Sequence, residues 1–353
     1  MRRRQRGFTL VEVMISLVIL ALVMSAVSTF FLGSMEQFKR QSRIAQTGMD
    51  SLIGLELLRK DIEHAGYGIP WNNIPSYSDA ASGILDDSGV APRGIASVNG
   101  GGWNGSDYLV VKAANVGMSD ASKKWTTLQV GDVKRAWTTV PADAENLGTT
   151  DRVIVLAPGT NGTNWRSLVV PAGWSTTFNN TSAFAPVAAA DTRVVYGIDG
   201  PDGNPLRMPF NRADYFLSTA NVPQRCAPNT GVLVKSVVRH SDGALDTELP
   251  LLDCVAAMQI WYDRDTDGDG AVDTASDDIT ALSAQEVRDQ VKQVRVSLLA
   301  HEGLFDRNYT HPVSSIPVGG VPVDLTDGAF LGNGQNYRWK VYTLSVTPQD
   351  LGG

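Results

Sequence analysis

The first 32 residues constrain this chain more than any other part of its sequence. A basic leader, residues 1–7, contains four arginines and ends in Gly7. The stretch from Phe8 to Leu32 that follows has Glu12 as its only charged residue. An apolar run of this length crosses the hydrocarbon layer of a membrane as one helix, and the leader arginines hold its start in the cytoplasm. The sequence therefore predicts a single-pass membrane segment with the rest of the chain outside the cytoplasm.

Glu12 is the unusual residue of this segment. An ionisable group at membrane depth costs about 2–3 kcal/mol or more, so such a residue is generally functional. Two simpler interpretations leave it unexplained. The stretch from Val13 to Val23 also suits a secretory signal cut near Ala26, although the apolar run outlasts the usual signal length. A plain single-pass anchor explains the length of the run, but not its carboxylate or the glycine that precedes it.

The same residues resemble the processing signal of type IV pilins and pseudopilins. The resemblance implies that a prepilin peptidase cuts between Gly7 and Phe8 and that the new amine of Phe8 is methylated. It also implies that Glu12 recognises a neighbouring subunit, and that the fold is α+β and pilin-like, with a long N-terminal helix packed on an antiparallel sheet. A carboxylate and an ammonium are poorly placed alone in lipid, and they are relieved when they meet between subunits in a helix bundle.

The helical pattern continues beyond the membrane segment. No proline interrupts it until Gly66, Gly68 and Pro70 end it. We expect residues 8–33 to form the transmembrane or filament-core half of the helix and residues 34–66 an amphipathic half. Apolar residues recur there at intervals of three, four or seven, as in a helix packed on one side: Met35, Phe38, Ala45, Met49, Leu52, Leu55, Leu58, Ile62 and Ala65.

Residues 67–353 are predicted to form a β-rich globular domain. Short runs of β-branched and aromatic residues alternate there with Gly, Asn, Asp, Ser and Pro. Residues 72–106 and 117–190 are expected to be loop-rich insertions, and residues 283–291 a short helix. The predicted strands are 108–112, 152–156, 168–170, 193–196, 215–217, 232–238, 258–262, 294–299 and 339–346.

Charge and cysteine content agree with a secreted, membrane-tethered protein. The formal net charge is -7 and falls to -11 without the four leader arginines, so no nucleic-acid partner is expected. Cys226 and Cys254 both lie in the part expected outside the cytoplasm. A bridge between them would close a loop of about 29 residues and contribute about 3–4 kcal/mol on the chain-entropy model. Two buried thiols are the alternative.

Three further segments resemble the PilW-type minor pilins. They are the end of the long helix at residues 57–67, the block at 258–300 and the last predicted strand at 340–346. The resemblance is weak across residues 72–230. It implies a minor pilin of a type IV pilus. The J-type minor pseudopilin of type II secretion shares the helix and the general fold, but is usually shorter.

A run of alternating aspartates between residues 263 and 278 predicts a calcium site. Seven acidic residues stand there against one arginine, Arg264, and would repel one another without a cation. Alternating carboxylates with a glycine that allows a sharp turn suit Ca²⁺, a hard cation that binds oxygen. A solvated acidic hairpin turn built on Asp-Gly is the alternative.

Two frames of this run resemble a calcium loop, one starting at Asp263 and one at Asp265. Neither completes an EF-hand, because no glutamate occupies the closing position. The second frame is preferred because it uses Asp273 and keeps Asp277 beside the closing position. The predicted ligand residues are Asp265, Asp267, Asp269, Ala271, Asp273 and Asp277.

Enzymatic interpretations find no support in the sequence. The glycines of residues 100–105 have the dinucleotide-binding spacing, but they lead into a strand instead of opening a helix. The four histidines are dispersed, and no G-x-S-x-G or Walker motif occurs. We therefore expect a non-catalytic protein.

The expected function is that of a minor pilin in the initiation or tip assembly of a pilus, or in surface interaction. The expected partners are other pilins, the prepilin peptidase and, before assembly, the inner membrane. The globular domain would lie in the periplasm and later on the pilus or cell surface. The alternatives are a type II secretion pseudopilin and a membrane-anchored, calcium-dependent adhesin or binding module.

Overall fold

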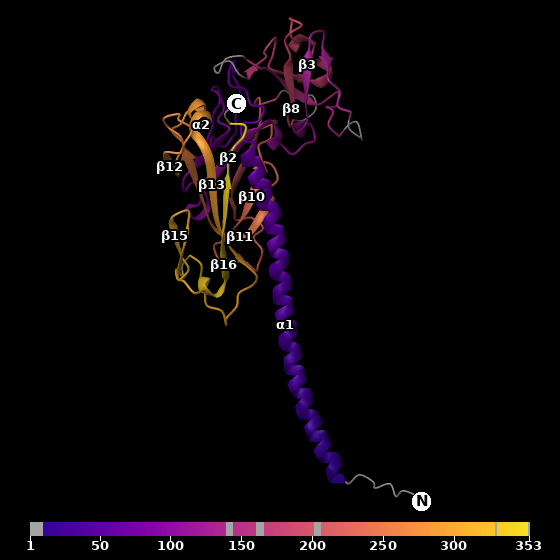
Figure 1. Ribbon diagram of the computed structural model, residues 1–353, viewed down its shortest axis with the longest axis vertical. Coiled ribbons are helices and arrows are strands. Elements are labelled where there is room, and N and C mark those ends of the chain that lie inside the picture. Colours follow the sequence, from indigo (N-terminus) through magenta and orange to yellow (C-terminus); the bar gives the residue numbers. More distant parts are fainter. Residues whose placement is uncertain (1–9, 139–143, 160–165, 201–205, 329, 352–353) are drawn as a thin grey trace, which may run out of the picture. The chain divides into compact units, whose positions relative to one another are not determined.

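The computed structural model in Figure 1 describes residues 10–138, 144–159, 166–200, 206–328 and 330–351. The chain divides into two compact units between Met49 and Asp50. The first unit consists of the N-terminal part of helix α1 (Leu10–Glu63), and the second contains the last turns of α1 and all of the strands. The predicted helix start at Phe8 lies outside the described residues.

The N-terminal part of α1 has the length and composition of a membrane span. Residues Leu10–Leu32 have a mean hydropathy of 2.6. None of the large apolar side chains of this stretch is buried within the chain; Leu10 and Phe30, for example, are more than three-quarters exposed. An apolar helix surface of this extent needs lipid or neighbouring helices to cover it.

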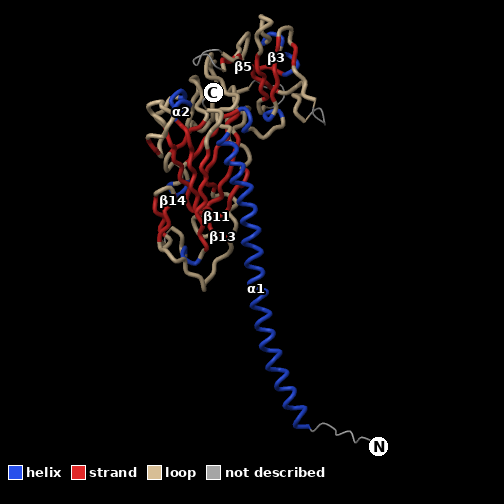
Figure 2. Tube along the Cα trace, viewed as in Figure 1, coloured by secondary structure: helices blue, strands red, loops and turns tan. Residues whose placement is uncertain are grey.

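The second unit is built on an antiparallel sheet of eight strands, whose order is β1-β2-β9-β10-β11-β13-β16, with β12 also paired to β11. Figure 2 shows β11 and β13 as long neighbouring strands of this sheet. The bounds are β1 (Ile95–Val98), β2 (Tyr108–Ala113), β9 (Asn211–Ser218), β10 (Gly231–Val237), β11 (Leu249–Arg264), β12 (Thr274–Ser276), β13 (Val291–Glu302) and β16 (Arg338–Val346).

The last turns of α1 pack on this sheet. Leu55, Leu58 and Ile62 are buried in the same core as the side chains of the central strands, and burial of each contributes about 1.5–3 kcal/mol. At Gly54 the helix lies so close to β11 that a Cβ atom there would lie 2.0 Å from the carbonyl oxygen of Leu251. The absence of a side chain at Gly54 therefore lets the helix lie against the sheet.

Among the described side chains of the apolar stripe predicted along α1, those near its C-terminal end are the covered ones. Leu55, Leu58, Ile62 and Ala65 are buried. Met35, Phe38 and Leu52 are exposed, and the side chains of Ala45 and Met49 lie outside those described. The helical period therefore indicates which residues share a face, but not how far along the helix a partner covers that face.

A second, antiparallel sheet is inserted between β2 and β9. Its strand order is β4-β3-β8-β5-β6, with β7 also paired to β5, and Figure 2 shows β3 and β5 within it. Residues 117–190, predicted to be loop-rich, therefore contribute most of a sheet. The bounds are β3 (Trp125–Gln129), β4 (Val133–Lys134), β5 (Arg152–Ala157), β6 (Ser167–Leu168), β7 (Ser175–Thr177) and β8 (Arg193–Gly197).

The remaining elements are a hairpin and short helices. Helix α2 (Ala284–Gln290) confirms the predicted helix at 283–291, and a capping box between Ser283 and Glu286 starts it. The hairpin consists of β14 (Ser315–Val318) and β15 (Val321–Asp324). The short 3₁₀ helices are Trp103–Gly105, Ala114–Val116, Ala121–Lys123, Phe178–Asn180, Ser182–Phe184 and Gly334–Asn336.

Candidate assembly segment, aspartate loop and groove

Glu12 lies in the first described turn of α1. Its neighbours Leu10, Val11, Val13 and Met14 are all exposed, so the carboxylate stands on an apolar helix surface. Gly7 and Phe8, the predicted processing residues, lie outside the described residues. The described segment thus has the form of a membrane-length helix with an acidic group near its start.

The aspartate loop connects β11 to β12 and brings three of the predicted ligands together. Oxygen atoms of Asp265, Asp267 and Asp269 lie within 4.8 Å of one another. Asp265 is buried at the centre of the loop, where it accepts hydrogen bonds from the N–H groups of Gly268 (2.7 Å) and Gly270 (2.9 Å). These three aspartates occupy the first positions of the frame that starts at Asp265.

The electrostatics of the loop already favour charged aspartates. Burial raises the pKa of Asp265, but the hydrogen bonds from Gly268 and Gly270 and the ammonium of Lys292 outweigh it, so the pKa lies below its usual value. Lys292 Nζ lies 3.3 Å from Asp265 Oδ2. Lys292 thus already places a positive charge next to Asp265. A bound metal ion would add further positive charge and lower the pKa of the aspartates in the same direction.

Three other acidic side chains of the segment have different partners. Asp273 accepts hydrogen bonds from the N–H and the hydroxyl of Thr266, both at 2.8 Å. Asp277 accepts one from the side-chain amide of Asn99 at 2.9 Å. Asp263 is paired with Arg295 at 2.7 Å. Of the predicted carboxylate ligands, the structure therefore gathers the first three and holds Asp273 and Asp277 in other contacts.

Cys226 and Cys254 form a disulfide. This confirms the predicted bridge, and the alternative of two buried thiols is wrong. Cys254 belongs to β11, and its positive φ of 58° lies at a register shift between β10 and β11. The bridge ties the turn after β9 to the central strand. His301 of β13 lies beside the two sulfur atoms, and its Nε2 accepts a hydrogen bond from the N–H of Ala227 at 2.9 Å.

One buried charge cluster fixes the end of α1 on the sheet, and the sequence analysis did not identify it. Lys235 of β10 lies 2.5 Å from Asp61 of the helix, and the hydroxyl of Tyr215 of β9 also donates to Asp61. Tyr215 is fully buried. The signal was a lysine within the apolar strand predicted at 232–238, which needs a buried acidic partner.

A second buried cluster holds the segment before β1 on the same sheet. Lys112 of β2 lies 2.5 Å from Asp79 and 2.7 Å from Asp87. Arg212 of β9 lies 3.1 Å from Asp79 and 2.7 Å from Asp214. The side chains of Lys112, Arg212, Asp79 and Asp214 are fully buried. Balanced charge allows these groups to be buried at low cost.

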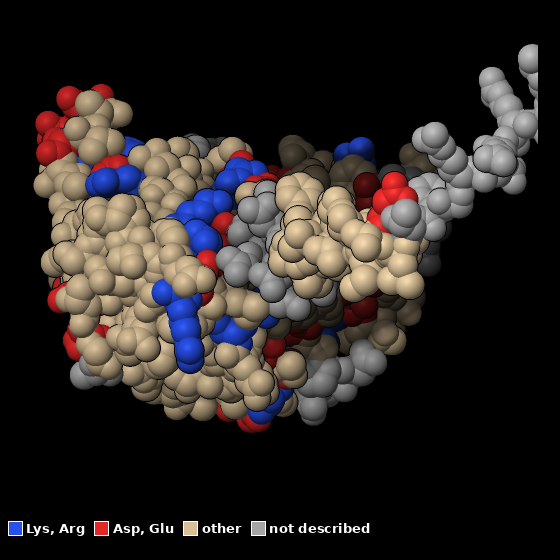
Figure 3. All heavy atoms as spheres, turned by 90° about the horizontal axis from the view of Figure 1, so that it is seen from below, with Lys and Arg blue, Asp and Glu red and all other residues tan. Residues whose placement is uncertain are grey.

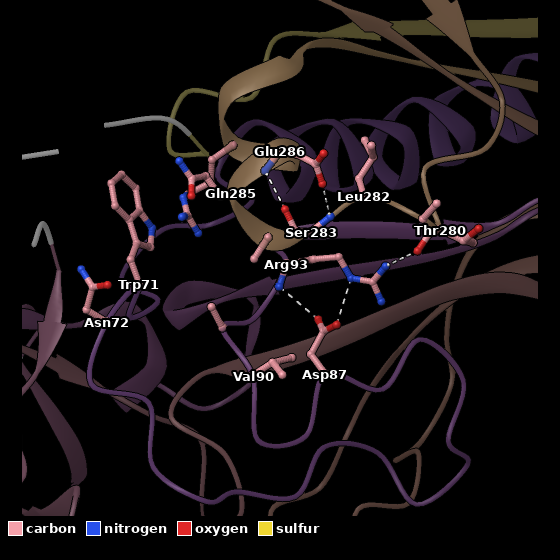
Figure 4. Close-up of a pocket in the computed structure, with 14 residues that line it drawn as sticks. Trp71, Asn72, Asp87, Val90, Arg93, Thr280, Leu282, Ser283, Gln285 and Glu286 are labelled. Atoms are coloured by element: carbon pink, nitrogen blue, oxygen red, sulfur yellow. Dashed lines mark hydrogen bonds and ion pairs between the residues drawn. The ribbon is translucent and has the colours of Figure 1, made fainter. Parts of the chain in front are cut away.

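A groove of about 620 Å³ lies between the segment that follows α1 and the start of α2. Figure 4 shows Trp71, Asp87 and Arg93 from the first segment and Ser283, Gln285 and Glu286 from the second along it. Arg93 donates from Nε to Asp87 at 2.9 Å and from Nη1 to the carbonyl of Thr280 at 3.1 Å. Both polar and apolar side chains line it.

The wider surface is mixed in charge. On the face that Figure 3 presents, Lys and Arg side chains lie among Asp and Glu side chains. The chain as a whole is acidic, with a net charge of -7. Any recognition of an anion by this protein would therefore depend on a local arrangement of cations rather than on the overall field.

Two parts of the chain match known families. Residues 2–28 match the prokaryotic N-terminal methylation motif. Residues 215–347 match the type IV pilus-assembly protein W family. The second match runs from β9 to the end of β16 and includes the aspartate loop and both cysteines. The inserted sheet lies outside it.

The other comparisons add little. No curated protein sequence matched the chain. A type IV-like pilin from Thermus thermophilus is 16% identical over 43% of this chain and 83% of that chain, with a TM-score of 0.17, which is too low to bear on the fold. The chain therefore carries the methylation motif at its N-terminus and a type IV pilus-assembly protein W domain over residues 215–347, the combination expected of a PilW-type minor pilin.

Proposed function

We propose that this minor pilin acts as a non-catalytic subunit in the initiation or tip assembly of a pilus. The observation that carries the proposal is the apolar helix surface from Leu10 to Leu32, none of which is buried within the chain. Before assembly, the inner membrane would cover this surface, with the β-rich unit in the periplasm. In the filament, the helices of other pilins would cover it.

Glu12 would set the register of that assembly. In lipid a carboxylate is costly, and an ion pair with the amine at the start of a neighbouring subunit would lower that cost. The groups that would pair are both near the helix start, so the contact favours one axial offset between subunits. Pilus subunits are therefore the expected partners, and the finished filament at the cell surface is the expected location.

The two matched families favour a pilus over the alternatives. A type II secretion pseudopilin would share the N-terminal motif but not the pilus-assembly protein W domain. A membrane-anchored adhesin outside any filament would need neither Glu12 nor the methylation motif. Recovery of the protein in purified pili, compared with a strain that lacks the secretion system, would test the assignment directly.

The mature protein is expected to begin at Phe8 with a methylated amine. The peptidase that reads this motif cuts after Gly7, and the cut exposes the amine that Glu12 of a neighbour requires. Mass analysis of the N-terminal peptide from the native host checks this. A start near Val27 would indicate an ordinary secretory signal and contradict the pilin assignment.

The calcium site stays a prediction, supported by the proximity of Asp265, Asp267 and Asp269. Calcium that binds only the folded chain stabilises it by about 2.7 kcal/mol at a hundredfold excess over Kd. The gain should be larger for calcium than for magnesium, since a flexible carboxylate loop suits the larger ion. Melting curves of the full chain in detergent, with calcium and with chelator, measure it.

The double variant Asp267→Asn/Asp269→Asn should abolish the calcium-dependent rise in melting temperature. It removes two charges and keeps side-chain size. Asp289→Asn, an exposed acid on α2, is the matched control and should preserve the rise. Equal melting temperatures of the folded wild type in calcium and in chelator would identify the loop as a solvated acidic turn instead.

A further inference from the structure

Arg288 of α2 lines the groove, and among the described residues it has no carboxylate partner within ion-pair distance. Its Nη1 atom is buried and makes no hydrogen bond, and no described carboxylate forms an ion pair with it. Its guanidinium instead stacks on the ring of Trp71, at 4.6 Å from the ring centre. A partly desolvated cation with no acceptor is costly unless something else supplies the anion.

A second arginine increases the positive charge at this end of the groove. The guanidinium of Arg166 lies 5.0 Å from the centre of the Trp71 ring. It donates to two main-chain carbonyls, those of Gly66 at 2.6 Å and of Asp350 at 3.2 Å, and the carboxylate of Asp350 also acts on its charge. Burial lowers the pKa of Arg288; the carboxylate of Asp289 opposes this effect, and Arg166 adds to it.

The carboxylates that line the groove are already engaged elsewhere. Asp87 accepts from Lys112 at 2.7 Å and from Arg93 at 2.9 Å. Glu286 accepts from the N–H of Ser283 at 2.8 Å as part of the capping box. Neither carboxylate is paired with Arg288, so an external acceptor would meet the part of its guanidinium that lines the groove, while the buried Nη1 atom is closed to solvent.

We propose that this groove binds a carboxylate-bearing segment of a partner protein, with Arg288 as its anchor. A planar guanidinium matches a carboxylate with two parallel N–H donors. A phosphate dianion would call for further donors, whereas Arg166 Nη1 and Arg93 Nε and Nη1 already donate to groups within the chain. The groove, at about 620 Å³, is much larger than one carboxylate and has room for several residues of an acidic peptide, whose apolar parts would contact Val90 and Leu282.

Calorimetry on the full chain in nonionic-detergent micelles at low salt tests this inference. The probes are a blocked tetraglutamate peptide, a blocked tetraglutamine peptide of equal length, and inorganic phosphate. Tetraglutamate should bind, and the two other probes should bind at least about tenfold more weakly. Because the assay does not require filament formation, its result is independent of the proposed role in assembly.

Two variants of Arg288 and one control make the test specific. Arg288→Gln should weaken tetraglutamate binding about tenfold or more, and Arg288→Lys should weaken it less, because it keeps the charge but loses the fork. Arg239→Gln, which removes an exposed arginine outside the groove, should change affinity less than about twofold.

The inference fails if tetraglutamate does not bind, or if tetraglutamine binds equally well. It also fails if phosphate binds more tightly than tetraglutamate, which would make the groove a phosphate site. Unchanged affinity in both Arg288 variants would place the binding elsewhere. If Arg288→Gln does not fold, as judged by its melting transition, the comparison of Arg288→Lys with Arg239→Gln decides.

Discussion

Replacement of Glu12 by alanine is expected to leave the protein in the membrane and to remove it from filaments. The substitution deletes the only charge of the apolar run and lowers the cost of insertion by about 2–3 kcal/mol. It also deletes the group that would meet the amine of a neighbouring subunit. The amount recovered in sheared filaments should fall about tenfold or more, which corresponds to a loss of about 1.4 kcal/mol or more of assembly free energy.

Ser16→Ala provides the matched control for this prediction. Ser16 lies one turn away in the same apolar helix, and its hydroxyl donates to the main-chain carbonyl of Glu12 at 2.7 Å rather than to its side chain. This variant should therefore enter filaments at the wild-type level. Immunoblots of membrane and sheared fractions measure both variants. Wild-type recovery of Glu12→Ala would show that Glu12 is not a register-setting contact.

Acidification from pH 7 to pH 4 is expected to destabilise the β-rich unit strongly, because two histidines are buried. Burial, with a smaller effect of Arg225, lowers the pKa of His301 to about 3. Burial, reinforced by Arg207 and Arg152 and opposed by Asp199, lowers the pKa of His240 to about 4. In the folded state, both rings therefore take up a proton only at a lower pH than a free histidine.

The direction of this pH effect on stability depends on whether the folded or the unfolded chain binds more protons. An unfolded histidine titrates near pH 6.5, so between pH 6.5 and the lowered pKa the unfolded chain holds a proton that the folded chain does not. The stabilisation by the neutral rings is complete above pH 6.5 and decreases as the pH falls. By pH 4, each of the two histidines should lower the free energy of unfolding by about 3 kcal/mol.

Asp107 opposes this trend in part. Burial raises its pKa to about 6, although hydrogen bonds from the N–H groups of Gly100 and Ile260 act in the other direction. In the folded state this carboxyl group keeps its proton to a higher pH than it does in the unfolded chain. Its contribution to stability is therefore greatest below its unfolded pKa and is lost as the pH rises through 6. At pH 4, protonated Asp107 therefore offsets about 2 kcal/mol of the stability lost through the two histidines.

His301→Gln should reduce the loss of stability between pH 7 and pH 4 by about 3 kcal/mol. A glutamine oxygen can still accept from the N–H of Ala227, and it does not titrate. Urea unfolding of the full chain in detergent at the two pH values gives the difference. His311→Gln, on a loop, is the control and should leave the difference unchanged. An equal pH effect in wild type and His301→Gln would contradict the assigned titration.

Several features of this protein could be read from local sequence. The N-terminal helix ends at Glu63, three residues before the predicted end at residue 66, and the strands predicted at 108–112, 193–196 and 339–346 agree with the structure within one residue. Their signals are local: unbroken apolarity, a glycine and proline stop, and short runs of β-branched residues. The matched families confirm the pilin assignment, which also rested on adjacent residues at the N-terminus.

Other features could not be predicted, because distant residues create them. The strand predicted at 215–217 extends back to Asn211 as β9, since Arg212 and Asp214 are paired within the buried charge cluster. The strand predicted at 258–262 begins instead at Leu249, because β10 and β13 pair along its length. Polar residues carry no strand signal until their partners are known.

The sequence alone determined the class of the protein, its processing motif and the acidic group of its membrane helix, because each depends on residues that are close in the chain. Only the tertiary structure decided which charges meet. Asp61 finds Lys235 across 174 positions of sequence, and three of the predicted loop aspartates converge while Asp273 and Asp277 take other partners. Burial makes an unpaired charge costly, so charged residues that are buried in the packed sheet lie next to a partner of opposite charge. Arg288 differs from them, because its guanidinium stacks on Trp71 and its Nη1 atom makes no hydrogen bond.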